Sequence, residues 1–260
     1  MNSHITKPLS IAGLACLSFF LLALLAQPID LDARVSFFVK IGGGYGGQSQ
    51  DYNTNSTFSY FAENGTLAGA YKLSTSGLFL ETGLGVYFTP NIGLEILFNP
   101  DLFSKSGTAD FTAAVPHPFH FNQFRTATWS ATALKYSGME LDLNILGRIA
   151  LLRGKLGIYA LAGLAYFPSV KVTNLSEVSW TEAGYPYTSV TGTPVYAEFS
   201  KAVFGFDVGG GVEYFIVGGL GVNISARYVI ASAKLDIGNG AQIDVKPGGI
   251  RLAGGLKYAF

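Results

Sequence analysis

The sequence predicts an all-β chain that forms an eight-stranded antiparallel transmembrane up-and-down β-barrel with four long external loops and three short periplasmic turns. Apolar and polar residues alternate in eight separate stretches, and the connections between those stretches alternate between long and short. The composition is apolar, with 49% hydrophobic and 13% charged residues. Beyond the N-terminus, the longest apolar stretch, residues 214–233, is interrupted by Asn223, Arg227 and three glycines, which argues against a spanning helix. A closed barrel is the other structure that satisfies the backbone in lipid.

The N-terminus has the layout of a secretory signal peptide. Lys7 precedes an apolar run over residues 8–26, and Ala26 is a small residue suited to the cleavage site. We therefore expect a signal peptide at residues 1–26 and the barrel domain at residues 27–260; an uncleaved anchor helix is the alternative. The one cysteine, Cys16, lies in the apolar run, so the processed chain has no disulfide or thiol chemistry to consider.

The first three strands are predicted at residues 35–45, 78–88 and 92–98. Successive side chains along a strand point to opposite faces, and each of these stretches places apolar residues on one face and small or charged residues on the other. A polar segment, residues 46–76, separates the first two and is far too long for a hairpin turn. The second and third are joined by Thr89, Pro90 and Asn91, which supply turn chemistry.

The fourth and fifth strands are predicted at residues 136–149 and 156–166. The fourth follows a second long loop at residues 99–132 and has apolar residues facing one way and polar residues facing the other. The tight turn at residues 152–154 leads into the fifth, which is apolar on both faces. Its orientation therefore stays open at this stage.

The last three strands are predicted at residues 203–214, 220–228 and 248–260. A long loop at residues 167–201 precedes this group, residues 215–219 form a short turn between its first two strands, and a fourth long loop at residues 231–247 leads to the last strand. A meander across an outer membrane produces this alternation of loop length, because turns on the periplasmic side are short and external loops are long.

Aromatic residues recur near both ends of the predicted strands, as expected for girdles at the two bilayer interfaces. The ring on the turn side comprises Phe37, Phe88, Tyr214, Tyr258 and Phe260, and the ring on the loop side comprises Tyr45, Phe98, Tyr136, Tyr166, Phe204 and Tyr228.

The hairpin at residues 83–95, Gly-Leu-Gly-Val-Tyr-Phe-Thr-Pro-Asn-Ile-Gly-Leu-Glu, resembles the second hairpin of small outer-membrane barrels of the opacity-protein and outer membrane protein W type, a group similar to the OmpA transmembrane domain. The last strand is also similar to the closing strand of such barrels, which commonly ends in an aromatic residue. The resemblance implies passage of small hydrophobic solutes or surface adhesion. It also implies that Tyr258 and Phe260 act as an assembly signal read by the barrel-assembly machinery.

The predicted inner face carries five cations and six anions. An eight-stranded barrel is wide enough only for side chains or one small ligand, so we expect these charges to pair. The expected network comprises Lys40, Glu81, Glu95, Glu140, Asp142, Arg148, Asp207, Glu213, Arg227, Arg251 and Lys257. It either plugs the barrel or, with the many inward glycines, lines a gated polar path.

The most favoured function is a small channel or passive transporter for small solutes with a structural role in the envelope. The alternative is an adhesin or host-ligand-binding protein that acts through the external loops, because loops on a rigid scaffold are where recognition resides. The candidate binding residues in the loops are Tyr52, Phe58, Trp180, Tyr185 and Tyr187. The expected surroundings are outer-membrane lipid and lipopolysaccharide or its equivalent.

We expect no enzymatic activity, no cofactor and no metal. The processed chain offers two histidines, His117 and His120, and no Gly-x-Ser-x-Gly element or cluster of metal ligands. The formal net charge is zero and no basic block occurs, so nucleic acid is not expected as a partner.

Overall fold

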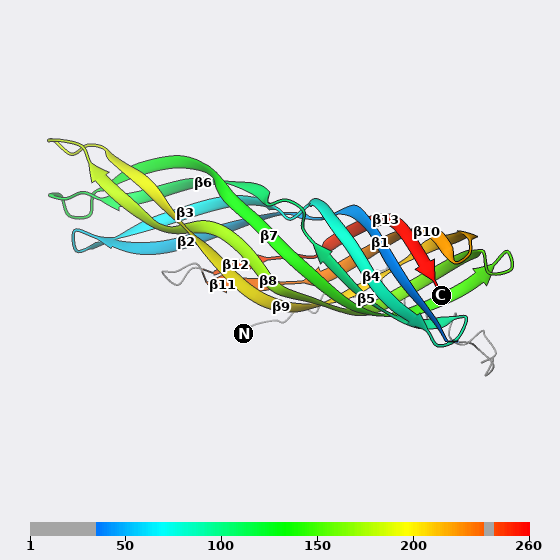
Figure 1. The fold of residues 1–260 in the computed structure, drawn as a ribbon. Helices are drawn as coiled ribbons and strands as arrows, with labels where there is room; N and C mark the ends of the chain where they lie inside the picture. Colours follow the sequence, from blue (N-terminus) through cyan, green and yellow to red (C-terminus); the bar gives the residue numbers. More distant parts are fainter. Residues whose placement is uncertain (1–34, 237–241) are drawn as a thin grey trace, which may run out of the picture.

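The computed structural model describes residues 35–236 and 242–260, which form antiparallel β-structure in an elongated molecule (Figure 1). The signal peptide expected at residues 1–26 lies outside the described residues. The strands are β1 (Ser36–Gly47), β2 (Ser49–Tyr60), β3 (Glu63–Ser74), β4 (Gly77–Tyr87), β5 (Ile92–Pro100), β6 (Lys105–Pro116), β7 (Phe124–Leu151), β8 (Leu156–Glu182), β9 (Val190–Val217), β10 (Leu220–Ala231), β11 (Ala233–Asp236), β12 (Gln242–Val245) and β13 (Gly249–Ala259).

Eight of these strands close into an antiparallel barrel, which confirms the predicted fold class. The order around the ring is β1, β4, β5, β7, β8, β9, β10 and β13, and β13 pairs with β1 to complete it. The seam runs in register from Phe38 opposite Ala259 to Gly47 opposite Ile250. Each of the eight predicted strands corresponds to one barrel strand.

The long connections differ from the prediction, because they are themselves largely β-sheet. Residues expected as the first loop form the hairpin β2–β3, and those of the second loop form β6 and the distal half of β7. The third loop is a continuation of β8 and β9, which are 27 and 28 residues long, and the fourth contains the hairpin β11–β12. At about 3.3 Å per residue, β8 extends far beyond the 9–11 residues that cross a bilayer.

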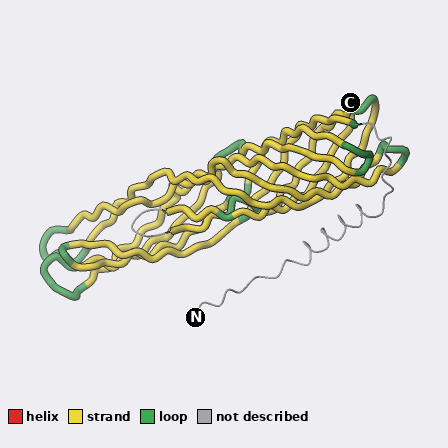
Figure 2. Tube along the Cα trace, turned by 90° about the horizontal axis from the view of Figure 1, so that it is seen from below, coloured by secondary structure: helices red, strands yellow, loops and turns green. Residues whose placement is uncertain are grey.

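We call this second part of the molecule the extension. It contains β2, β3, β6, the hairpin β11–β12 and the halves of β7, β8 and β9 distant from the short turns. Its main sheet has the order β2-β3-β6-β7-β8-β9, with β2 and the distal half of β9 as its edge strands. Figure 2 shows strands running along the length of the molecule, with connections at its two ends and others midway, where the barrel meets the extension.

The outward faces of the two parts differ in chemistry. Outward positions of the barrel are apolar, including Ile41, Leu84, Ile96, Leu143 and Ile224, which are between 49% and 69% exposed. Outward positions of the extension are mostly polar, as in β2, where Ser49, Asp51, Asn53, Asn55, Thr57 and Ser59 all face solvent. The apolar band suits lipid and the polar surface suits water, which explains why the strands change character along their length.

The interior of the extension has a hydrophobic core of its own. At its base, Phe167 and Val172 of β8 pack with Leu235 of β11 and Ile243 of β12. Further along, Tyr71, Phe111 and Leu134 form a second buried cluster. This inward face explains why the polar loops of the prediction could form sheet, since alternate residues on their strands are buried.

Most of the predicted girdle residues are exposed, as expected. One differs: Tyr136 is 1% exposed and packs inward against the core at the base of the extension. Tyr136 lies on the same face of β7 as Glu140 and Asp142, which stand at even positions and are also buried. Strict alternation therefore places Tyr136 inside, and its assignment to the aromatic girdle was wrong.

None of the described residues forms a helix that is long and apolar enough to cross a membrane.

Candidate functional site

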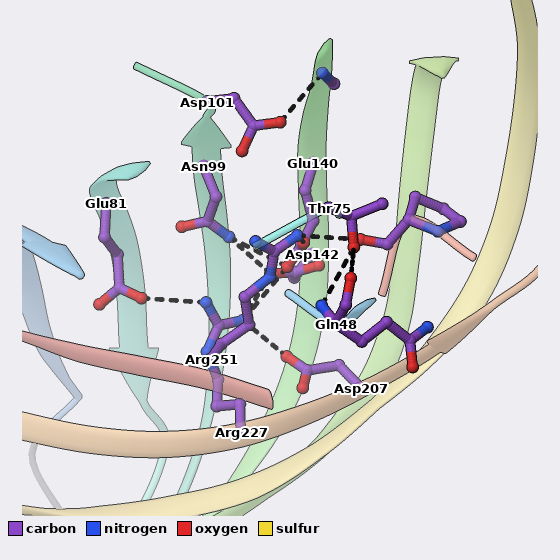
Figure 3. Close-up of polar contacts among 12 residues, drawn as sticks. Gln48, Thr75, Glu81, Asn99, Asp101, Glu140, Asp142, Asp207, Arg227 and Arg251 are labelled. Atoms are coloured by element: carbon purple, nitrogen blue, oxygen red, sulfur yellow. Dashed lines mark hydrogen bonds and ion pairs between the residues drawn. The ribbon is translucent and has the colours of Figure 1, made fainter. Parts of the chain in front are cut away.

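Arg227 lies at the centre of the barrel interior, on β10 (Figure 3). Its side chain is fully buried, and its Nη1 atom donates hydrogen bonds to Asp142 Oδ2 at 2.6 Å and Asp207 Oδ2 at 2.8 Å. Its Nη2 atom donates to Glu81 Oε2 at 3.0 Å. One guanidinium group therefore links carboxylates from three other strands, a geometry for which its planar set of donors is well suited.

Two further cations extend this cluster. Lys40 Nζ lies 3.1 Å from Glu81 Oε1 and 2.9 Å from Glu95 Oε2. Arg251 Nη2 donates to Glu140 Oε2 at 2.8 Å, and the Arg251 guanidinium lies 5.3 Å from the centre of the Phe79 ring.

A second cluster lies toward the short turns. Lys257 Nζ donates to Glu213 Oε2 at 2.6 Å and to the Tyr87 hydroxyl at 3.1 Å, and it sits 3.7 Å from the centre of the Phe38 ring. Arg148 Nε is 2.5 Å from Glu213 Oε1. Cation–π contact and ion pairing together hold these charges where water is excluded.

The structure places all eleven residues of the expected charged network inside the barrel, and each has an ion-pair partner from the same set. Hydrophobic residues pack between and beyond the charged clusters: Phe38, Leu146, Tyr159 and Leu161 lie beside the second cluster, and the core at the base of the extension lies at the other end of the network. The lumen is thus filled by side chains of alternating chemistry.

The two residues expected to signal assembly lie on the outer surface of the closing strand. Tyr258 is 45% and Phe260 66% exposed. The Phe260 backbone exchanges two hydrogen bonds with Phe37, of 3.0 and 2.9 Å, and the two rings stack with centroids 6.2 Å apart. Through these hydrogen bonds and this ring contact, Phe260 stabilises the pairing of β13 with β1.

The candidate binding residues in the loops separate into two groups. Tyr52, Phe58 and Trp180 face the interior of the extension: Tyr52 stacks on Tyr71 at 4.6 Å, and Phe58 stacks on Trp180 at 5.1 Å. Their expected exposure in loops was wrong, because they are inward positions of strands. Tyr185 is 89% exposed in the β8–β9 turn, and Tyr187 is half-buried beside it.

The turns between β2 and β3, β6 and β7, and β8 and β9 meet at the far end of the extension, and we call residues 61–62, 117–124 and 183–189 the tip (Figure 1). Arg125, just below it, holds the turns together. It forms a two-point ion pair with Glu182, in which Nη2 donates to Oε1 at 2.8 Å, and it also donates to the backbone oxygens of Pro116 and Tyr187 at 2.6 and 3.2 Å.

Further polar contacts join the first hairpin to this assembly. The Tyr60 hydroxyl donates to Glu182 Oε1 at 2.9 Å. Hydrogen bonding from Arg125 lowers the pKa of the Glu182 carboxyl, whereas partial burial and the neighbouring carboxylate raise the pKa of Tyr60 to about 12. Glu182 is therefore ionised and Tyr60 protonated at neutral pH.

Sequence reasoning missed the tip residues Phe61, Phe119, Phe121 and Phe124, which are between 52% and 80% exposed. The signal that finds them is a position in, or directly beside, a turn of two to seven residues between paired strands. That signal can be used only once the strands are known, and the sequence indicated loops there. Among the described residues, no group of three or more His, Cys, Asp or Glu side chains is arranged to hold a metal ion.

A shallow groove of about 510 Å³ lies over β1, β4, β5 and β13, and is lined mainly by outward apolar residues such as Val39, Leu84, Ile96 and Leu256. Since these residues belong to the apolar band, acyl chains are the natural occupants.

Comparison with known proteins points in one direction. Residues 12–260 match the family model described as the outer membrane protein beta-barrel domain. Among solved structures, the chain is similar to the outer membrane protein OprG from Pseudomonas aeruginosa, with 10% identity, a TM-score of 0.47, and coverage of 88% of this chain and 97% of that one. The search of curated proteins found no match.

Two other similar structures are Neisserial surface protein A and the outer membrane protease OmpT from Escherichia coli. The first has 10% identity and a TM-score of 0.41, covering 86% of this chain and 97% of that one. The second has 12% identity and a TM-score of 0.44, covering 90% and 99%.

Proposed function

Because the chain belongs to the outer membrane protein β-barrel domain family, we propose that it is a non-enzymatic surface-binding protein of the bacterial outer membrane. In this role the barrel is an anchor, and the extension presents a binding surface to host or other external ligands. Of the two functions that the sequence favours, this proposal takes the adhesin or host-ligand-binding protein.

The observation that carries the proposal is the contrast between the filled lumen and the ordered extension. Arg227, Asp142 and Asp207 in mid-barrel have side chains with 0% exposure. A channel needs a continuous path, and a buried ion-pair cluster of this kind has to break before solutes pass.

The extension supports a binding role through its size and rigidity. Three buried clusters, together with the stacked pairs Tyr52–Tyr71 and Phe111–Trp129, fill its interior. Such aromatic pairs contribute roughly 0.5–1.5 kcal/mol each beyond their burial. A preorganised surface loses little conformational entropy when it binds, which favours affinity.

The passive-transport hypothesis has a direct electrical test. We expect the refolded chain in a planar bilayer to show no sustained open-state conductance, because the charged network occupies the lumen. Stable conductance steps that persist in the presence of the intact extension would favour the channel over the adhesin.

Adhesion is tested by displaying the full chain on a non-adherent laboratory bacterium and counting bacteria bound to cultured epithelial cells. The comparison variant lacks the distal ends of the three long hairpins, residues 57–66, 111–129 and 176–195. Each excision joins two directly paired residues, Ser56 with Leu67, Asp110 with Ser130 and Leu175 with Tyr196, through a two-residue Asn-Gly turn.

We expect the full chain to increase cell binding over the empty strain and the shortened variant to lose that increase. Heat-modifiable gel mobility verifies that the shortened variant still forms a barrel. Equal binding by the shortened and full chains would contradict the proposal, as would binding by neither above the empty strain.

A further inference from the structure

The tip lies at the end of the molecule furthest from the short turns (Figures 1 and 2). Five aromatic side chains are exposed there. Phe61 is 54% exposed, Phe119 67%, Phe121 80%, Phe124 52% and Tyr185 89%. They come from three separate hairpin ends: four lie in turns and Phe124 is the first residue of β7. Ligand pockets, in contrast, have their aromatic residues on concave walls.

Elsewhere in the described part of the chain, exposed aromatic side chains are concentrated on the barrel. Among the described residues, the other exposed Phe and Tyr side chains lie on the apolar band and ends of the barrel or, in the case of Phe103, in the short β5–β6 connection at its rim. Phe37, Phe88, Tyr258 and Phe260, at the turn end, are 45–66% exposed. The tip and the turn end of the barrel, which faces lipid, therefore expose the same residue types, Phe and Tyr, to a similar degree.

The polar outer surface of the extension separates these two aromatic zones. Outward positions of β3, β6 and β7 include Thr66, Thr108, Thr112, Thr126 and Thr128. A continuous apolar surface would indicate one deep membrane insertion, whereas two aromatic zones with a polar stretch between them indicate two separate interfaces.

The rings are held in place from below. The Arg125–Glu182 pair and the Tyr60 hydroxyl fix the bases of the turns, and the Phe119 and Tyr187 rings lie 5.2 Å apart. Fixed turns present the rings to a surface without a large ordering cost.

The backbone at Phe61 gives further support. Phe61 and Ala62 have φ angles of 48° and 63°, the left-handed values of a two-residue hairpin turn. Asn-Gly fits such a turn with less strain. The chain therefore holds an aromatic residue at a position where local stability favours a small polar pair.

We propose that the tip inserts its rings into the interface of an opposing lipid bilayer, so that the protein bridges its own outer membrane to a second membrane. This inference rests on the proposed surface-binding function and assigns its partner class. Phe and Tyr rings partition into the headgroup region of a bilayer, and rings on separate convex turns fit a deformable surface better than a rigid protein partner.

The test uses the full chain in nanodiscs captured on a surface and measures binding of extruded phosphatidylcholine vesicles. The test variant combines Phe61→Asn, Ala62→Gly, Phe119→Ser, Phe121→Ser and Tyr185→Ser. The first two changes give the turn its preferred residues, so loss of binding cannot be attributed to a weakened turn. The matched control is Val195→Ser, which removes an apolar side chain that is 45% exposed on the side of the extension.

We expect vesicle affinity to fall by about 100-fold in the test variant and to stay unchanged in the control. A second measurement uses Tyr185→Trp, whose added fluorescence should shift to the blue and be quenched by vesicles containing brominated phosphatidylcholine. No vesicle binding by the full chain, or equal binding by the test variant, would overturn the inference.

The two proposals fail in distinguishable ways. If the full chain binds cells but not protein-free vesicles, surface binding stands and the partner is a protein or glycan. If the full chain binds neither cells nor vesicles, both proposals fail. If it binds vesicles and the test variant loses vesicle and cell binding together, the lipid interface is the surface that the protein recognises.

Discussion

Arg227 is surrounded by carboxylates from several strands, and its replacement tests how far the barrel depends on charge pairing. Its Nη atoms contact Glu81, Asp142 and Asp207 at 2.6–3.0 Å. Arg227→Met keeps much of the side-chain volume and leaves the carboxylates without their shared cation. Breaking a buried pair in this way costs roughly 3–5 kcal/mol, because an uncompensated charge stays buried.

The measurement is the urea midpoint of the refolded protein in micelles, read as the loss of heat-modifiable mobility. Lys171→Met is a suitable control, since the Lys171–Glu198 pair is about half exposed and exposed pairs contribute roughly 0–1 kcal/mol. Equal midpoints for the two variants would show that the network does not stabilise the barrel.

The Arg125–Glu182 pair predicts a pH dependence that is confined to the tip. The pKa of Glu182 lies below its ordinary value of 4.5 because Arg125 donates hydrogen bonds to the carboxylate. A carboxyl group with a lowered pKa in the folded state stabilises that state above its unfolded pKa, and the contribution is lost as pH falls through the folded pKa.

We therefore expect amide exchange in the three tip turns to accelerate as the pH falls below the ordinary carboxyl value, beyond the intrinsic change in exchange chemistry. Glu182→Gln should show faster exchange at neutral pH and no further acid-dependent step. A wild-type tip whose protection factors stay constant down through this range would refute the role assigned to the pair.

At the scale of elements, the seam between β1 and β13 depends on glycines that let the two strands approach. A Cβ at Gly255 would lie 2.3 Å from the Ile41 carbonyl oxygen and 2.6 Å from the Gly42 Cα atom, both backbone atoms. At the adjacent Gly254 the nearest atom to a Cβ is Asn223 O at 3.7 Å, an ordinary contact.

Gly255→Ala should therefore impair closure of the barrel, and Gly254→Ala should be tolerated. The fraction of protein that reaches the outer membrane in a heat-modifiable form measures this difference, and we expect a several-fold decrease for Gly255→Ala alone. Similar assembly of both variants would mean that the seam adjusts by a backbone shift.

The strands of the extension and those of the barrel also differ in which of their two faces is apolar. The barrel strands have their apolar residues outside and charged residues inside, whereas the extension has apolar residues inside and polar residues outside. In β7 this reversal occurs within one strand, between outward Thr128 in the extension and outward Leu143 in the barrel. If every apolar strand face is assumed to contact lipid, the inward and outward residues of the barrel are predicted correctly. The same assumption predicts the wrong faces for the extension.

At the scale of the whole molecule, the pairing pattern indicates that the barrel closes without the extension. The β2–β3 hairpin pairs with β6 but takes no part in the ring of eight strands. At its base, Gln48 and Thr75 lie side by side, with the Thr75 backbone N–H donating to the Gln48 carbonyl oxygen at 2.8 Å.

Excision of residues 49–74, with an Asn-Gly link between Gln48 and Thr75, should leave heat-modifiable mobility intact. The same excision should expose the core around Phe111 and Leu134 and make the extension sensitive to external protease. Loss of barrel formation in this variant would show that the two parts fold as one cooperative unit.

The charged interior shows how far a sequence prediction of a site extends. Alternation along the strands identified all eleven inward charges, because a period of two fixes the face of a side chain once a strand is recognised. It did not identify their partners: Arg227 and Glu81 are 146 positions apart, and they meet at 3.0 Å through the closure of the ring.

The tip shows where such prediction ends. Of the five loop residues proposed for binding, Tyr52, Phe58 and Trp180 pack inside the extension, and Tyr185 lies fully at the surface. The error has one cause: these polar segments contain Asn, Asp, Gly and Pro, which are depleted in strands. Their strands form because alternate positions pack against a core supplied by other parts of the chain.

The sequence by itself determined the barrel: its eight strands, the faces of its charged residues and its closing aromatic end. These features are set by local alternation and by turn chemistry between neighbouring strands. The tertiary structure decided that the lumen is filled, that the long connections form a β-sheet extension, and that five aromatic rings converge at its tip. Each of these features depends on contacts between residues that are far apart in the chain. The pattern of neighbouring residues carries no information on the energies of such contacts.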